Sequence, residues 1–141
     1  MIHGPTKVIT SDTDLLKKYD LAYSDILLLN ECGLINVNSS NMHFDISTDN
    51  SSILFTNEKL ILVKGSCIEQ KRVIFGVYSL TQAGKELHSI LIQKSDSNYI
   101  FDFGLLITQK NAAQSPIVSI HEVIEVKNDN VEYIEEPLNI F

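Results

Sequence analysis

Short apolar runs separated by clusters of turn residues fill the chain from Asn36 to Leu80, and this pattern restricts the fold more than any other feature. The runs HFDI, ILF, KLILVKG and RVIFGVY are rich in β-branched and aromatic residues, and Asn, Ser, Asp and Gly gather around them. Runs of this composition between turn signals are typical of antiparallel strands. The middle of the chain therefore predicts three or four strands.

Helical patterns lie before these strands. Residues 11–19 predict a short helix with Ser11 as its N-cap. Residues 22–32 space their apolar side chains as a helix does, and Gly33 follows as a C-cap signal. We expect Cys32 to be a buried residue on the apolar face of this second helix.

A third helix is predicted after the strands, over residues 81–92, where Thr81 can cap the first turn. Gly84 in that turn costs about 1 kcal/mol relative to alanine, which indicates a close contact with a neighbouring helix. The apolar stripes of the second and third helices predict a shared core, formed by Ile26, Leu29, Leu87 and Ile90.

The last third of the chain gives two further signals. The stretch NYIFDFGLLITQK suits a helix or a strand, and we favour the helix. The runs IVSIHEVIEV and VEYIEEPLNI are joined by KNDN, a strong turn signal, so residues 117–136 predict a hairpin.

This order of elements resembles a winged-helix unit. The sequence is similar to the C-terminal domain of a family of uncharacterised bacterial proteins, some of them found near abortive-infection and other phage-defence systems. In that family LxxxGLI precedes LTxAGKEL by some tens of residues, as LNECGLI and LTQAGKEL stand here. The residues that carry the resemblance are Ile26, Leu29, Cys32, Gly33, Leu34, Ile35, Tyr78, Leu80, Thr81, Gly84 and Leu87. The resemblance covers roughly residues 12–110, and it implies a fold and a defence context but no catalytic residue.

The expected fold class is therefore α+β, with a winged-helix-like core of helices and a small antiparallel sheet, followed by a C-terminal β-hairpin. A chain of 141 residues with 44% hydrophobic residues suits one compact unit. We expect an N-terminal arm over residues 1–10, the winged-helix-like domain over 11–110, and an acidic hairpin over 111–141 packed on the same domain.

Charge argues against strong binding to nucleic acid. The formal net charge is -7, and residues 22–32, the position of a recognition helix, hold no basic residue. The alternative function is a winged-helix DNA-binding regulator. Its contacts would be the basic residues on or near the predicted wing, namely Lys59, Lys64, Lys71 and Arg72.

No catalytic or metal-binding motif stands out. The histidines are isolated in sequence, and Cys32 and Cys67 are not spaced as metal ligands. For His88 and His121 we expect surface or hydrogen-bonded structural roles. We therefore expect no enzyme activity, no metal and no cofactor.

The last 31 residues hold six acidic side chains and one basic one, so five of the seven net negative charges lie there. An acidic hairpin can dock on a basic protein surface, by charge or by strand addition. We therefore expect a protein-interaction module, linked to phage defence or counter-defence. Its partner would have a basic surface and bind Glu122, Glu125, Glu132 and Glu135.

The N-terminal residues MIHGPTKVIT lack the apolar region of a signal peptide, and no run of about 18 apolar residues occurs. These features predict a cytoplasmic protein that does not enter a membrane. The sequence does not indicate an oligomeric state.

Overall fold

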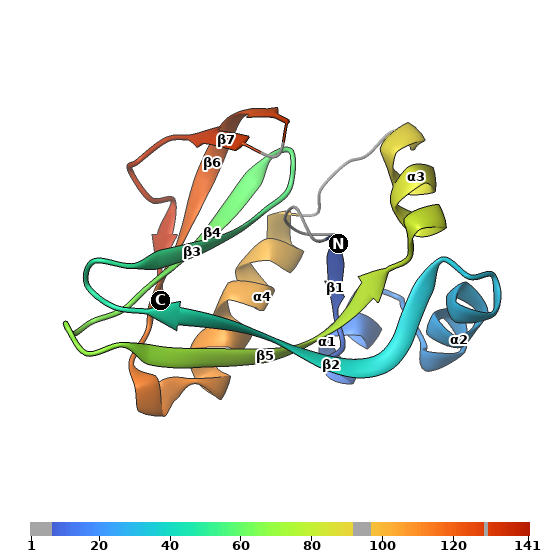
Figure 1. Ribbon diagram of the computed structural model, residues 1–141, viewed down its shortest axis with the longest axis horizontal. Helices are drawn as coiled ribbons and strands as arrows, with labels where there is room; N and C mark the ends of the chain where they lie inside the picture. The colour runs from blue at the N-terminus through green and yellow to red at the C-terminus, as the bar shows by residue number, and fades with distance from the viewer. Residues whose placement is uncertain (1–6, 92–96, 129) are drawn as a thin grey trace.

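The computed structural model describes residues 7–91, 97–128 and 130–141, and its strands form two antiparallel sheets (Figure 1). The first sheet has the order β1-β5-β2, from β1 (Val8–Thr10), β5 (Lys71–Leu80) and β2 (Ile35–Ile46). The second has the order β3-β4-β6-β7, from β3 (Ser51–Phe55), β4 (Lys59–Lys64), β6 (Ile117–Lys127) and β7 (Asn130–Tyr133). The short strand β8 (Asn139–Ile140) also pairs with β6.

Helices cover the sheets in two places. The helices are α1 (Thr13–Lys18), α2 (Tyr23–Glu31), α3 (Gln82–Ile90) and α4 (Ser97–Lys110), and a 3-10 turn η1 (Ala112–Gln114) follows α4. Helix α4 contacts β4 and β6 of one sheet and β5 of the other. Helices α2 and α3 lie at the opposite end of the first sheet from the second sheet (Figure 1).

The main core forms between the two sheets and α4. Four side chains of α4 are almost fully buried in it, namely Tyr99, Ile100, Phe103 and Ile107. Their spacing follows one face of a helix, which explains why the ambiguous segment is helical. The predicted helix in this segment is therefore confirmed.

Two smaller cores flank the main one. One lies at the α2 end of the first sheet and includes Ile9, Leu16, Ile26 and Leu80. The other lies within the second sheet, which curls into half a barrel around Phe55, Leu60 and Val123.

The predicted winged-helix-like core with a small sheet is wrong. Strand β6 pairs with β4 along its first half and with β7 along its second half, so the C-terminal strands complete a large sheet. The physical reason is that the first half of β6 is buried on both faces. Val118 and Ile120 pack in the main core, and Ser119 and His121 are buried on the opposite face, so neither face of β6 meets solvent from residue 118 to residue 121.

The predicted strands, helices and C-terminal hairpin are confirmed as elements; the first three helices are shorter than predicted, whereas α4 begins one residue before the predicted segment. The N-cap of α1 is Asp12 and not Ser11, because the Asp12 side chain accepts the hydrogen bond from Leu15 N–H. Residues 1–6 of the predicted arm, Ile92 of the predicted third helix and Asp129 in the hairpin turn lie outside the described residues. Val8–Thr10 form β1, which pairs with β5.

The core predicted between the second and third helices is wrong in part. Ile26 is fully buried and Leu29 is half-buried, but Leu87 is 40% exposed and Ile90 is 77% exposed. Cys32 is exposed, contrary to expectation, because it follows the last turn of α2 on a side that nothing in the described ranges covers. None of the helices in these ranges is long and apolar enough to cross a membrane.

Candidate interaction surface

A pocket of about 150 Å³ opens between α2 and α3 and is lined almost wholly by apolar side chains. Its lining comes from β1, β2 and β5, from Leu29 near the end of α2, and from α3 along its length. The lining residues are Ile9, Leu29, Leu34, Ile35, Leu80, Gly84, Leu87, His88 and Leu91. We call this feature the α2–α3 groove.

Helix α3 is attached to the rest of the protein at its first turn. The Thr81 side chain accepts a hydrogen bond from Gly84 N–H and donates one to the carbonyl oxygen of Gly33. Thr81 N–H also donates to the carbonyl of Leu34. Gly84 lies so close to that same carbonyl that a Cβ atom would overlap it, so the close contact expected at this glycine is made by the backbone between α2 and β2 and not by a neighbouring helix.

The far end of α3 carries large apolar side chains into solvent. Ile90 is 77% exposed and Leu91 is 56% exposed, and Leu87 and Leu91 form part of the groove wall. On α2, Leu29 lines the pocket from the opposite side. Exposed apolar side chains grouped around a pocket are typical of an interaction site.

The sequence contained a signal for this surface. Leu27, Leu28 and Leu29 are consecutive, and three consecutive residues of a helix cannot all face one core. The helical spacing of Leu87 and Ile90 predicts an apolar stripe, and a stripe of this kind can face a partner as well as the core.

A second hollow, between α1 and α4, is polar and internally paired. Asp102 accepts hydrogen bonds from the Tyr19 hydroxyl and lies 2.7 Å from Lys18 Nζ, and Asp12 lies 3.0 Å from Lys110 Nζ. Burial by itself raises the pKa of each carboxyl group, but these hydrogen bonds and charges outweigh burial and hold both pKa values below the usual range. These groups hold α1 against α4, and their charges are already balanced within the protein.

Among the described residues, Ser119 and His121 most resemble the nucleophile and base of a catalytic pair. Ser119 Oγ lies 2.8 Å from His121 Nε2, and His121 Nδ1 lies 2.8 Å from the carbonyl oxygen of Ile134. Because a carbonyl can only accept, Nδ1 donates to it, and in a neutral imidazole Nε2 is then the acceptor for the serine hydroxyl. His121 is 4% exposed and Ser119 is 7% exposed, and the Tyr133 ring packs on the imidazole. The pair therefore fastens the C-terminal segment to β6, as expected for a hydrogen-bonded structural histidine.

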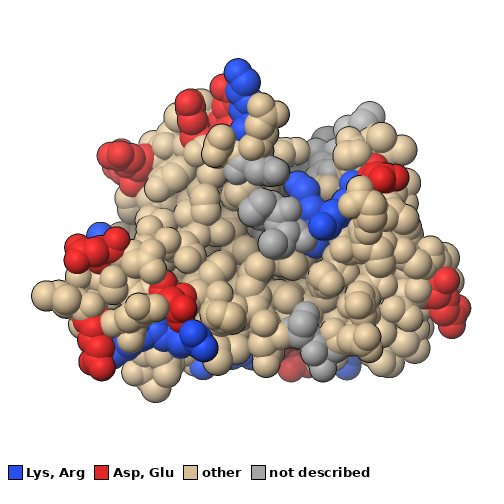
Figure 2. Space-filling view, in the orientation of Figure 1, with Lys and Arg blue, Asp and Glu red and all other residues tan. Residues whose placement is uncertain are grey.

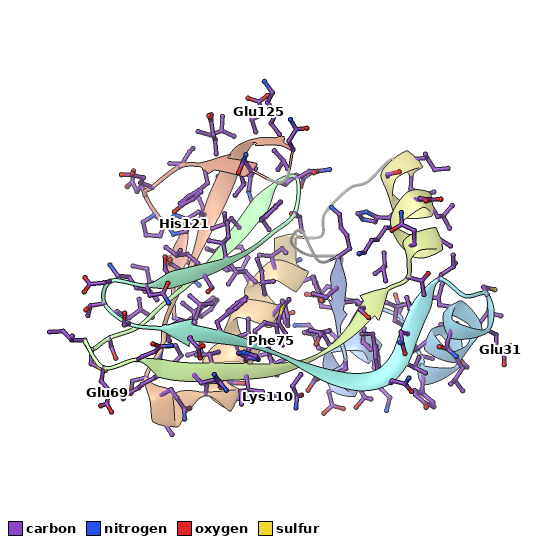
Figure 3. The ribbon with its side chains drawn as sticks, in the orientation of Figure 1. Glu31, Glu69, Phe75, Lys110, His121 and Glu125 are labelled. Atoms are coloured by element: carbon purple, nitrogen blue, oxygen red, sulfur yellow. The ribbon has the colours of Figure 1, made fainter. Side chains whose placement is uncertain are left out.

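The four predicted partner-binding carboxylates are exposed on and beside the β6–β7 hairpin. Glu125 and Glu132 are direct cross-strand neighbours, whereas Glu122 lies opposite Lys59 and Glu135 follows β7. In Figure 3 the hairpin that carries Glu125 lies far from the end of α2 that carries Glu31. Whether these carboxylates bind a partner stays a prediction.

The four basic residues proposed for nucleic acid do not share one element. Lys59 and Lys64 are at opposite ends of β4, while Lys71 and Arg72 begin β5 in the other sheet. The Arg72 guanidinium lies 2.8 Å from Asp45, and this hydrogen bond lowers the pKa of the Asp45 carboxyl group. On the face shown in Figure 2, charged side chains lie mostly toward the edge.

Comparison with protein families gives one match. The family described as "Protein of unknown function (DUF2806)" matches residues 7–103, which is more than half of the chain. The chain belongs to the DUF2806 family. Comparison with curated proteins gives no match, and comparison with solved structures gives none either.

The DUF2806 region contains the complete α2–α3 groove, since the lining residues run from Ile9 to Leu91. It ends within α4 and does not include β6 or the acidic hairpin. Among the described residues, no group of three or more His, Cys, Asp or Glu side chains is arranged to hold a metal ion.

Proposed function

We propose that this protein is a non-catalytic protein-interaction module that binds another polypeptide in the α2–α3 groove. The observation that carries the proposal is the group of exposed apolar side chains around the groove, above all Ile90 and Leu91. A polypeptide bound there would remove these side chains from water, at about 25 cal/mol per Å² of apolar surface.

The rest of the molecule supports this choice over catalysis. A catalytic pair needs access to a substrate, and Ser119 and His121 are almost completely buried. The charged hollow between α1 and α4 is occupied by its own ion pairs. The groove lies within the DUF2806 region. Binding in the groove is therefore a function that other members of the family can share.

The proposal places the module in the cytoplasm, where reducing conditions keep cysteines as thiols. Cys32 and Cys67 are both unpaired, in agreement with such a compartment. The association with phage defence stays a prediction from sequence resemblance.

Site-specific photo-crosslinking in the native host tests the proposal. A photoreactive residue replaces Ile90, and in a matched control it replaces Ile68, which is 82% exposed in the loop between β4 and β5. We expect nuclease-resistant crosslinks to polypeptide from position 90, and fewer from position 68. Adding Leu87→Ser, which changes an exposed residue of the groove lining, should weaken the crosslinks at position 90. Equal crosslinking at both positions would reject the groove as the binding site.

A further inference from the structure

Helix α3 offers both an apolar projection and one wall of an apolar pocket. Ile90 projects at its end and is 77% exposed. Leu87 and Leu91 line the pocket. A projection and a hole on the same surface are what a two-fold symmetric interface requires, because each copy must supply both halves of the contact.

The dimensions of the pocket agree with such an exchange. A cavity of about 150 Å³ accepts a molecule as large as benzene. One isoleucine or leucine side chain is of that size. The pocket walls are apolar, so an inserted aliphatic side chain leaves no polar group without a partner.

The charges on α3 also allow two copies to meet. The helix carries one lysine and one glutamate, Lys85 and Glu86, and Gln82 donates a hydrogen bond to Glu86. Its formal charge is therefore zero, although the chain carries -7. Helix α2 carries only acidic charges, Asp25 and Glu31, so Lys85 of a second copy would meet the opposite charge there.

We infer that the polypeptide bound in the α2–α3 groove is helix α3 of a second copy of this chain, in a two-fold symmetric dimer. This inference rests on the proposed function and names its partner. Ile90 of each copy enters the pocket of the other, where Leu29, Leu87 and Leu91 surround the inserted side chain. The polar residues of α3 form the rim of the interface, as in other specific protein interfaces.

The first experiment measures the mass of the full chain by sedimentation over a hundredfold range of concentration. We expect a dimer that dissociates on dilution, and Ile90→Ser should shift it to monomer. Because two-fold symmetry places each substitution in the interface twice, the dissociation constant should rise by about a hundredfold or more. Ile68→Ser, at a position of similar exposure away from the groove, should leave the dissociation constant unchanged. Thermal unfolding of both variants shows that the fold is retained.

The second experiment identifies the contact. Light and heavy isotope-labelled chains are mixed, and a photoreactive residue at position 90 is activated. We expect crosslinks between light and heavy chains that map to the groove, at Leu29, Leu80 or His88.

Other results separate the two proposals. Crosslinks from position 90 to a different protein, with the purified chain monomeric, would overturn the dimer but keep the groove as an interaction site. Crosslinks only within one chain, or none above the Ile68 control, would overturn both. A dimer unaffected by Ile90→Ser would overturn the assignment of the groove to self-association.

Discussion

Glu125 of β6 lies directly opposite Glu132 of β7 in the C-terminal hairpin. Side chains in this cross-strand position are close neighbours, and two like charges there destabilise a sheet. Both carboxylates are exposed, so water and salt reduce the repulsion without removing it. The acidic character of the hairpin therefore carries a cost in stability.

Replacing Glu132 by Gln should remove this repulsion and stabilise the protein by about 0.2–1 kcal/mol at low salt. The gain should shrink as salt is raised, because salt screens exposed charges. Urea unfolding at two salt concentrations measures the effect. Glu135→Gln is the control, since Glu135 follows β7 and is paired with no strand residue in the described register. An equal gain in the control would mean that net charge, and not the cross-strand pair, is responsible.

Gly84→Ala tests the attachment of α3. Helix propensity alone favours alanine by about 1 kcal/mol. The added Cβ would overlap the carbonyl of Leu34, and overpacking of this kind typically costs about 1–3 kcal/mol. We expect a net loss in the free energy of unfolding and a loosening of α3, measured by urea titration and amide hydrogen exchange. A rise of about 1 kcal/mol would show that the helix is not held at this contact.

Ile26 and Leu87 should respond differently to truncation, although the sequence predicted one core for both. Ile26 is fully buried, so Ile26→Ala should cost about 2–5 kcal/mol. Leu87 is 40% exposed, so Leu87→Ala should cost less than half as much at a concentration where the protein is monomeric. Chemical unfolding of both variants measures the difference. Similar losses at the two positions would restore the predicted shared core.

Acid should weaken the contact between α1 and α4. The pKa values of Asp12 and Asp102 are lowered in the folded protein, where hydrogen bonds and lysine charges outweigh the effect of burial. Their contribution to stability is therefore complete above the ordinary carboxyl pKa of about 3.9, and it is lost as the pH falls through the lower folded values.

The variants Asp102→Asn and Lys110→Met isolate this contribution. Each should lower the free energy of unfolding at pH 7, and each should flatten its fall with decreasing pH. Urea unfolding between neutral and acidic pH provides the measurement. A pH dependence as steep as that of the unmodified protein would contradict the assignment.

Duplex DNA should bind no tighter than ordinary non-specific association, about 10⁻⁴ to 10⁻⁶ M near physiological salt. The protein carries -7, α2 has no basic residue, and Arg72 is paired with Asp45. Fluorescence anisotropy at about 150 mM salt measures the affinity. Submicromolar binding that is lost in a Lys64→Gln/Lys71→Gln variant would show that the basic residues form a nucleic-acid site.

Local patterns predicted the elements of this protein, but not how they assemble. The caps at Thr81 and Gly33 and the spacing of Tyr99, Phe103 and Ile107 depend on neighbouring residues, so the sequence indicates them. The pairing of β4 with β6 joins segments far apart in the chain, and no local pattern specifies a partner of that kind.

The candidate site was harder to predict for the same reason. A helical stripe of leucines shows that a helix has an apolar face, but it does not show whether that face meets the core or solvent. Asn111 is a similar case, because its loop sequence gave no sign of burial. In the structure its side chain bonds both backbone groups of Ile74, on a distant strand.

The central place of β6 has a consequence for how the protein is made. During synthesis β3 and β4 leave the ribosome well before β6, and until then the edge of β4 that β6 will occupy has no partner within its own sheet. Newly made chains can pair with one another through unpaired strand edges of this kind and aggregate. The nascent protein is therefore most exposed to aggregation through this edge over the interval before its last long strand emerges.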